Sequence, residues 1–249
     1  MISIVSPAKT LDYETQRDLP AATRHRFPSE TAELVVAATR LSAADIGRLM
    51  KISDTLAQLN YERYQNYATL PEKPAIQVFD GDVYTGLDAK TLDNEAILFA
   101  QDHLRILSGL YGMLRPLDLM KPYRLEMGTK RFPADHKLSI WWEDRIAKVL
   151  AEDAAETGNG TILNLASQEY WAAVKGRLPA NVRVVDVEFL AADGRFITMH
   201  AKLARGIMAR YQIDHRITAI DDMRSFDYGG YRFDAETSVR DRWTFRRVI

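Results

Sequence analysis

The chain has 249 residues, and its 33 Lys and Arg side chains are balanced by 34 Asp and Glu, which gives a net charge of −1. A hydrophobic content of 47% is enough to fill the core of one large globular domain, and the charge balance lacks the basic excess of proteins that coat DNA. No cysteine is present, which excludes disulfides, thiolate metal ligands and a cysteine nucleophile.

The amino-terminal segment predicts a buried strand followed by a polar loop. The apolar run from Ile2 to Val5 stops at Ser6 and Pro7, which places Lys9 in the loop at the strand end. This run is too short for the core of a signal peptide, and no later segment is long enough to span a bilayer. We therefore expect a soluble, cytoplasmic protein with no membrane partner.

Three helices and a second strand are predicted before residue 80. The helices cover residues 30–40, a segment that begins at Ser42, and a segment capped by Ser53. The spacing of Ser42 and Asp45 is that of a capping box variant. The strand is expected at residues 75–79, before a glycine-bearing turn.

Residues 99–128 combine a predicted helix, a glycine turn and basic side chains. Apolar residues recur at helical spacing from Ile97 to Leu107, and the pattern stops at Ser108. This segment nearly matches the L-x-G-h-G hairpin of a helix-hairpin-helix: Leu107, Gly109, Leu110 and Gly112 take the motif positions, and Tyr111 is an extra residue between the glycines. In that motif a glycine turn lets backbone N–H groups approach a phosphate. The alternative is an ordinary connection with a solvated basic face.

The remaining chain adds strands and helices without a repeat or a linker. We expect a helix at 140–156, a strand at 161–165 followed by a helix that Ser167 caps, a hairpin of strands at 182–190 and 195–200, a helix at 201–211 and a strand at 243–248. The fold class is therefore α+β, a single compact domain over residues 1–249 with a mixed β-sheet surrounded by helices.

The common cofactor and metal motifs are missing from the sequence. The five histidines show no HExxH or similar spacing, Gly81 and Gly86 lack the Lys that completes a P-loop, and there is no GxGxxG or GxSxG. We expect no metal and no cofactor.

Several cations and small polar residues on different turns remain as candidates for a site. They are Lys9, Thr10, Arg105, Ser108, Arg115, Arg124, Lys202 and Arg205. Residues 1–100 hold 10 basic and 14 acidic side chains, whereas the rest hold 23 and 20. An anion site is therefore expected to draw mainly on the later part of the chain.

Six sequence motifs are spread over nearly the whole chain. They are SPAKTLDY from Ser6, GDVYTGL from Gly81, LSGLYGMLRPLDLMKPYRLEMG from Leu107, NLASQEYW from Asn164, AKLARGIMARY from Ala201 and GYRFD from Gly230. Together they resemble the motifs of the YaaA family of peroxide stress proteins. The resemblance implies a cytoplasmic protein with a compact fold, a positively charged cleft and a helix-hairpin-helix that binds double-stranded or branched DNA. It also implies a role in limiting peroxide damage to DNA and protein, linked to lower free intracellular iron.

Carried over to this sequence, the resemblance assigns DNA binding to residues of the hairpin and the cleft. They are Lys9, Ser108, Gly109, Gly112, Arg115, Lys121, Arg124, Lys202 and Arg205. A second hypothesis stays open, an enzyme whose basic cleft holds a small phosphate- or carboxylate-bearing substrate, with Lys9, Tyr84, Glu126 or Ser167 in chemical roles. The near-neutral net charge favours the enzyme, whereas the hairpin favours DNA.

Overall fold

The computed structural model describes residues 1–157 and 159–248, and its central feature is a mixed sheet of seven strands. The sheet strands are β1 (Ile2–Val5), β5 (Leu104–Ser108), β6 (Gly112–Leu114), β8 (Thr161–Leu165), β9 (Arg183–Leu190), β10 (Tyr231–Phe233) and β11 (Arg242–Arg247). Their order across the sheet is β10-β11-β9-β8-β1-β5-β6. The five inner strands are parallel, and the edge strands β10 and β6 are antiparallel to their neighbours.

Helices and two short strand pairs surround this sheet. The helices are α1 (Pro28–Thr39), α2 (Ala43–Met50), α3 (Asp54–Gln65), α4 (Ala75–Val78), α5 (Asp82–Leu87), α6 (Asn94–His103), α7 (Leu138–Trp141), α8 (Arg145–Glu156), α9 (Gln168–Trp171) and α10 (Thr198–Asp214). Short 3-10 helices are η1 (Tyr67–Thr69), η2 (Ala89–Thr91), η3 (Ile220–Ser225) and η4 (Tyr228–Gly230). The strand pairs are β2 (Thr10–Leu11) with β4 (Phe79–Asp80), and β3 (Lys73–Pro74) with β7 (Leu119–Met120). The predicted α+β class with a mixed sheet is confirmed.

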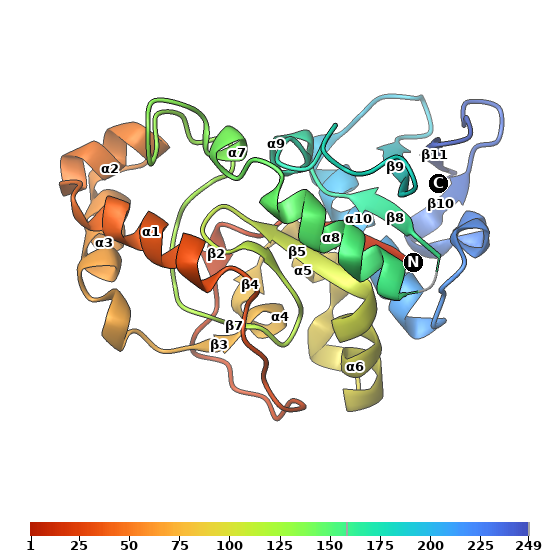
Figure 1. Cartoon of the computed structure of the whole chain (residues 1–249). Coiled ribbons are helices and arrows are strands. Elements are labelled where there is room, and N and C mark those ends of the chain that lie inside the picture. The colour runs from red at the N-terminus through yellow and green to blue at the C-terminus, as the bar shows by residue number, and fades with distance from the viewer. Residues whose placement is uncertain (158, 249) are drawn as a thin grey trace.

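The two faces of the sheet are covered by different helices. Ile4 is paired with Arg105 of β5, whose guanidinium contacts Asp153 of α8. Ser3, the neighbour of Ile4, points to the opposite face and donates a hydrogen bond to Gln212 of α10. Helices α8 and α10 therefore lie on opposite faces, and Figure 1 shows α8 in front of the strands and α10 behind them. Because both faces are covered, β1, β5 and β8 are buried along their whole length.

The predicted helix-hairpin-helix at residues 108–112 is not confirmed, because the structure forms a β-hairpin there. Helix α6 ends at His103, and the next five residues pair with β1 on one side and β6 on the other. The apolar run of β5 is buried on both faces, and such a run also satisfies the spacing of a helix. The chain turns between β5 and β6, with Gly112 at a positive φ of 68°.

Three further predictions are corrected in detail. Residues 75–78 form the short helix α4, and strand β4 begins only at Phe79. Residues 195–197 are irregular and lead into α10, so the expected hairpin after β9 does not form. The helix expected at 140–156 is interrupted between α7 and α8, where Glu143 has a positive φ of 48°. The strands at Ile2–Val5 and Thr161–Leu165 and the caps at Ser42 and Ser53 are confirmed.

Two glycines allow α5 and α10 to touch backbone to backbone. A Cβ atom on Gly86 would lie 2.2 Å from the Leu203 carbonyl oxygen, and one on Gly206 would lie 1.8 Å from the Val83 carbonyl oxygen. Neither distance is compatible with any side chain larger than hydrogen. This crossing fixes the position of α10, and of the cations on its amino-terminal half, relative to the end of β1.

Candidate anion-binding site

The order of the sheet reverses between β1 and β8. The chain leaves β1 to reach β5 on one side, and it leaves β8 to reach β9 on the other side. In open sheets with parallel strands, ligands bind outside the carboxyl ends of the strands at such a reversal point. The residues that follow β1 and β8 are therefore candidates for a ligand-binding site.

Two serines and a tyrosine connect these strand ends. Ser6 follows β1, and its hydroxyl donates a hydrogen bond to the Ser167 hydroxyl over 3.2 Å. The Ser167 N–H donates to the Ser6 hydroxyl oxygen over 2.8 Å. The Tyr84 hydroxyl, from α5, donates to the Ser6 carbonyl oxygen over 3.1 Å. Burial raises the pKa of the Tyr84 phenol well above its usual range, so it acts as a neutral donor.

Residues 124–128 bring two of the predicted cations together and contact the helix that follows β8. The Glu126 carboxylate lies 3.2 Å from the Lys9 ammonium and 3.0 Å from the Arg124 guanidinium. The Gly128 N–H donates a hydrogen bond to Glu169, two residues beyond Ser167. The Lys9 side chain remains 67% exposed, so its pairing with Glu126 is open to exchange.

Helix α10 supplies two more predicted cations, Lys202 and Arg205. They are three residues apart and so lie on the same side of the helix. Lys202 is exposed, whereas the Nε atom of Arg205 is buried and has no hydrogen-bond partner within the described part of the chain. Burial lowers the pKa of the Arg205 guanidinium. A buried N–H donor without an acceptor is costly, which marks this position for a functional explanation.

The remaining residues predicted for DNA binding are occupied within the fold. Ser108, Gly109 and Gly112 are buried in the β-hairpin, where the Ser108 hydroxyl lies 2.6 Å from that of Tyr123. Arg115 pairs with Asp118 over 3.2 Å. The Lys121 ammonium donates to the carbonyl oxygens of Tyr67 and Ala68. The contacts of Ser108 and Lys121 could not be read from sequence spacing, because they join segments that meet only in the folded chain, whereas Arg115 and Asp118 are only three residues apart.

A helical hairpin that the sequence did not single out is formed by α2 and α3. Only residues 51–53 separate the two helices, and a Cβ atom on Gly47 would lie 3.3 Å from that of Ala57, so the helices are in contact. Lys51 has a left-handed conformation, with φ of 53°, and is exposed at the turn. Figure 1 places this hairpin at the end of the molecule opposite the carboxyl-terminal strands. The signal present in the sequence was the pair of predicted caps, Ser42 and Ser53, only a short distance apart.

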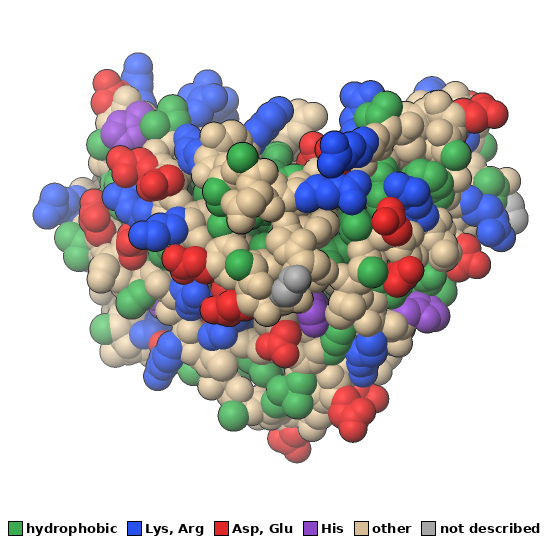
Figure 2. Space-filling model, turned by 45° about the vertical axis from the view of Figure 1, so that its right-hand side comes forward, with side chains coloured by type: hydrophobic (Ala, Val, Ile, Leu, Met, Phe, Trp, Pro, Cys, Tyr) green, Lys and Arg blue, Asp and Glu red, His purple; other side chains and the backbone are tan. Residues whose placement is uncertain are grey.

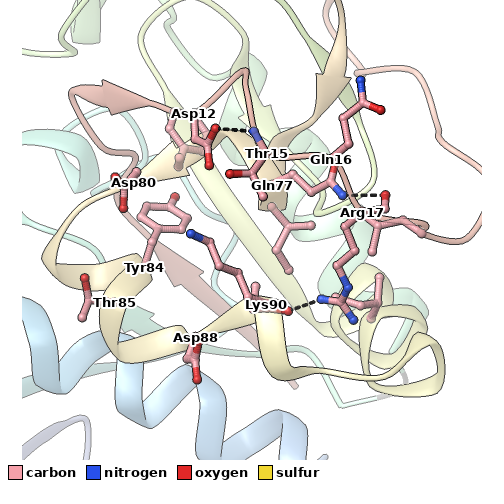
Figure 3. A pocket seen from close by; sticks show the side chains of 15 residues that line it. Asp12, Thr15, Gln16, Arg17, Gln77, Asp80, Tyr84, Thr85, Asp88 and Lys90 are labelled. Atoms are coloured by element: carbon pink, nitrogen blue, oxygen red, sulfur yellow. Dashed lines mark hydrogen bonds between the residues drawn. The ribbon is translucent and has the colours of Figure 1, made fainter.

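A cavity of about 400 Å³ lies beside Tyr84. Figure 3 shows Asp12, Asp80 and Lys90 around it, with the Lys90 side chain extended toward Tyr84. Hydrogen bonds from Thr15 lower the pKa of Asp12 to about 2, so this carboxyl is ionised at neutral pH. Charges of both signs therefore meet at this cavity, and none of the nine residues predicted for DNA binding lines it.

The surface carries charges of both signs, in keeping with the net charge of −1. Figure 2 shows acidic and basic side chains interspersed over one face, with Lys and Arg side chains on both sides of a notch in its upper edge. Within the residues that the structure describes, no helix has the length and apolar character that a bilayer crossing requires.

Comparison with known proteins identifies the family. Residues 1–237 match the family described as peroxide stress protein YaaA. The chain belongs to the YaaA family of peroxide stress proteins. YaaA relatives that carry the name UPF0246 protein cover almost the whole chain. A relative from Rhizorhabdus wittichii is 48% identical over 249 residues, which is 98% of each chain. One from Cupriavidus metallidurans is 45% identical over 262 residues, with 100% of this chain and 99% of the relative covered.

The match confirms the family resemblance seen in the six sequence motifs. Two of these YaaA motifs, SPAKTLDY and NLASQEYW, supply Ser6 and Ser167, which meet at the ends of β1 and β8, and the first also supplies Lys9 in the loop after β1. A third, AKLARGIMARY, supplies Lys202 and Arg205. The fold thus joins two distant YaaA motifs at the carboxyl ends of β1 and β8, and the third lies on α10, which packs against α5 beside Tyr84.

Proposed function

We propose that this YaaA protein binds the phosphate backbone of DNA during the peroxide stress response and thereby limits oxidative damage, and that α2 and α3 form the helix-hairpin-helix that contacts the phosphates. The proposal retains the link between this response and intracellular iron, and double-stranded or branched DNA is the expected partner. It rests on one structural observation, the exposed turn at residues 51–53 between two packed helices.

The turn has the properties that a phosphate contact requires. Lys51 supplies an exposed positive charge beside the amino-terminal end of α3. The first backbone N–H groups of a helix lack partners within the helix and carry a partial positive charge. In α3 the Ser53 hydroxyl accepts from the Leu56 N–H, so a phosphate would contact the N–H groups of Asp54 and Thr55. Phosphate oxygens accept from such groups without any base being read, so binding would depend little on sequence.

Asp54 sets a limit on how strongly this turn attracts DNA. Its carboxylate is exposed in the first turn of α3, close to where a phosphate would sit. A negative charge at a helix amino terminus stabilises the helix, but it repels an anion at the same place. Removing the charge of Lys51 and removing the charge of Asp54 should therefore change DNA affinity in opposite directions.

The test measures affinity for a fluorescent DNA duplex by anisotropy over a series of salt concentrations. Lys51→Ala should weaken binding about fivefold and make the slope of log affinity against log salt less negative by about 1, because one phosphate contact is lost. Asp54→Asn should strengthen binding. Lys148→Ala, which removes an exposed lysine on α8, is the matched control and should leave both quantities unchanged. Equal affinities for all three variants and the wild type would refute the assignment of the turn.

A further inference from the structure

We propose that the ends of β1 and β8 form a separate site for a small molecule bearing a phosphate or carboxylate group, held by Arg205 with Lys9, Lys202 and the hydroxyls of Ser6 and Ser167. The proposal goes beyond DNA binding, because it concerns a different ligand and residues outside the α2–α3 turn. We call these five residues the strand-end site.

The position of Arg205 follows from two contacts of α10. Gln212 accepts a hydrogen bond from Ser3 within β1, and Gly206 lies against Val83, next to Tyr84, which contacts the Ser6 carbonyl. Helix α10 therefore runs antiparallel to β1, with Gly206 near the carboxyl end of the strand.

The spacing along the helix and the strand agrees with this direction. Arg205 precedes Gln212 by two helical turns and so shares its side of the helix, facing the sheet, about 10 Å closer to the carboxyl end. Ser6 lies about 10 Å beyond Ser3 along the extended chain. Side chains on a helix lean toward its amino terminus, which directs the Arg205 guanidinium to the level of Ser6 and Ser167.

The positive charges at and near Arg205 favour the binding of an anion. Its Nε atom is buried without an acceptor, and its guanidinium forms no ion pair with any described residue. Lys202 lies one turn nearer the helix start and is exposed, and Lys9 follows β1 with its ammonium paired to Glu126. A planar guanidinium presents two parallel N–H donors that match both carboxylate and phosphate oxygens. The two serine hydroxyls add donors that can rotate toward a bound oxygen.

Burial decides in favour of a small ligand at this place. A DNA backbone is part of a wide duplex and reaches exposed side chains, whereas Arg205 is only partly exposed and its Nε atom is buried, so a compact anion fits this guanidinium better. The reversal point of the sheet between β1 and β8 is where open sheets bind small ligands. Burial also strengthens the attraction between a guanidinium and an anion that replaces its lost water.

The test measures the thermal stability of the full chain at constant ionic strength, with inorganic phosphate or sodium acetate replacing chloride. A ligand that binds only the folded state raises the melting temperature, so phosphate, acetate or both should stabilise the wild type. A larger shift with phosphate identifies a phosphate-bearing ligand, and a larger shift with acetate identifies a carboxylate. Arg205→Met should abolish the shift and raise the melting temperature without added anion, because a partly buried cation with an unpartnered Nε–H is removed.

Controls separate this site from the DNA proposal and from a structural role of Arg205. Arg240→Gln removes an exposed arginine just before β11, at the opposite edge of the sheet, and should retain the full shift. Ser167→Ala keeps every charge and should reduce the shift, which tests the site independently of whether Arg205→Met folds. Lys51→Ala should retain the anion response, and Arg205→Met should retain DNA affinity. The proposal is overturned if neither anion stabilises the wild type, or if the shift persists in both Arg205→Met and Ser167→Ala.

Discussion

Replacing Gly206 by alanine tests whether the contact between α5 and α10 holds the strand-end site together. The new Cβ atom would lie 1.8 Å from the Val83 carbonyl oxygen, and ordinary contact begins at 3.4 Å. The two helices must therefore separate by about 1.6 Å, which places the change at the upper end of overpacking costs, about 3 kcal/mol. For a chain of this length, that loss lowers the melting temperature by about 6 to 12 °C.

Gly47→Ala is the matched control, because Gly47 also lies inside a helix. Its Cβ atom would meet that of Ala57 at 3.3 Å, so only a small adjustment is needed, and the better helix propensity of alanine offsets it. Urea and thermal unfolding of both variants give the comparison. Gly206→Ala should also weaken the anion response, since Arg205 is displaced with α10. Equal stability of the two variants would refute the close helix contact as the feature that positions this site.

Two further predictions concern buried charge. Asp153 is buried and pairs with Arg105 over 2.6 Å and with Arg26 over 3.0 Å, so Asp153→Asn should lower the free energy of unfolding in urea by about 3 to 5 kcal/mol. The double variant Arg105→Met/Asp153→Leu should be much less destabilised. An equal loss of stability in both variants would contradict the buried ion pair. Burial lowers the pKa of both His25 and His103. Below about pH 6.5 the unfolded chain takes up protons at these side chains more readily than the folded chain, so stability should fall as the pH drops from 7 to 5, and less so in a His25→Gln/His103→Gln variant. Identical pH profiles would count against the partial burial of the two imidazoles as the cause.

Local signals in the sequence predicted many of the elements that frame the sites. Apolar runs bounded by turn residues marked β1 and β8, and the spacing of Ser42 and Asp45 predicted the capping box that the structure shows. The motifs also contained Lys9, Ser167, Lys202 and Arg205. The contact of Ser167 with Ser6 across the ends of β1 and β8 depends on strand order and could not be read along the chain.

The misassigned helix-hairpin-helix shows where periodicity fails. Residues 104–108 are apolar at positions that suit one face of a helix, yet they form a strand because neighbouring strands and helices cover both of its faces. Lys121 shows the same limit for charge, because its ammonium is bound by two carbonyl oxygens from η1, some fifty residues earlier in the chain. Gly86 and Gly206 were visible as glycines within helical patterns, which is a signal for close packing that the sequence alone could not pair.

The most direct test of the proposed function counts DNA strand breaks in peroxide-treated cells that lack their own copy of the protein and express a variant at equal level. If phosphate binding by the α2–α3 turn protects DNA, Lys51→Glu should leave as many breaks as cells without the protein, because charge reversal opposes the phosphate backbone. Asp54→Asn should protect at least as well as the wild type. Full protection by Lys51→Glu, together with its loss of DNA affinity in solution, would contradict the account.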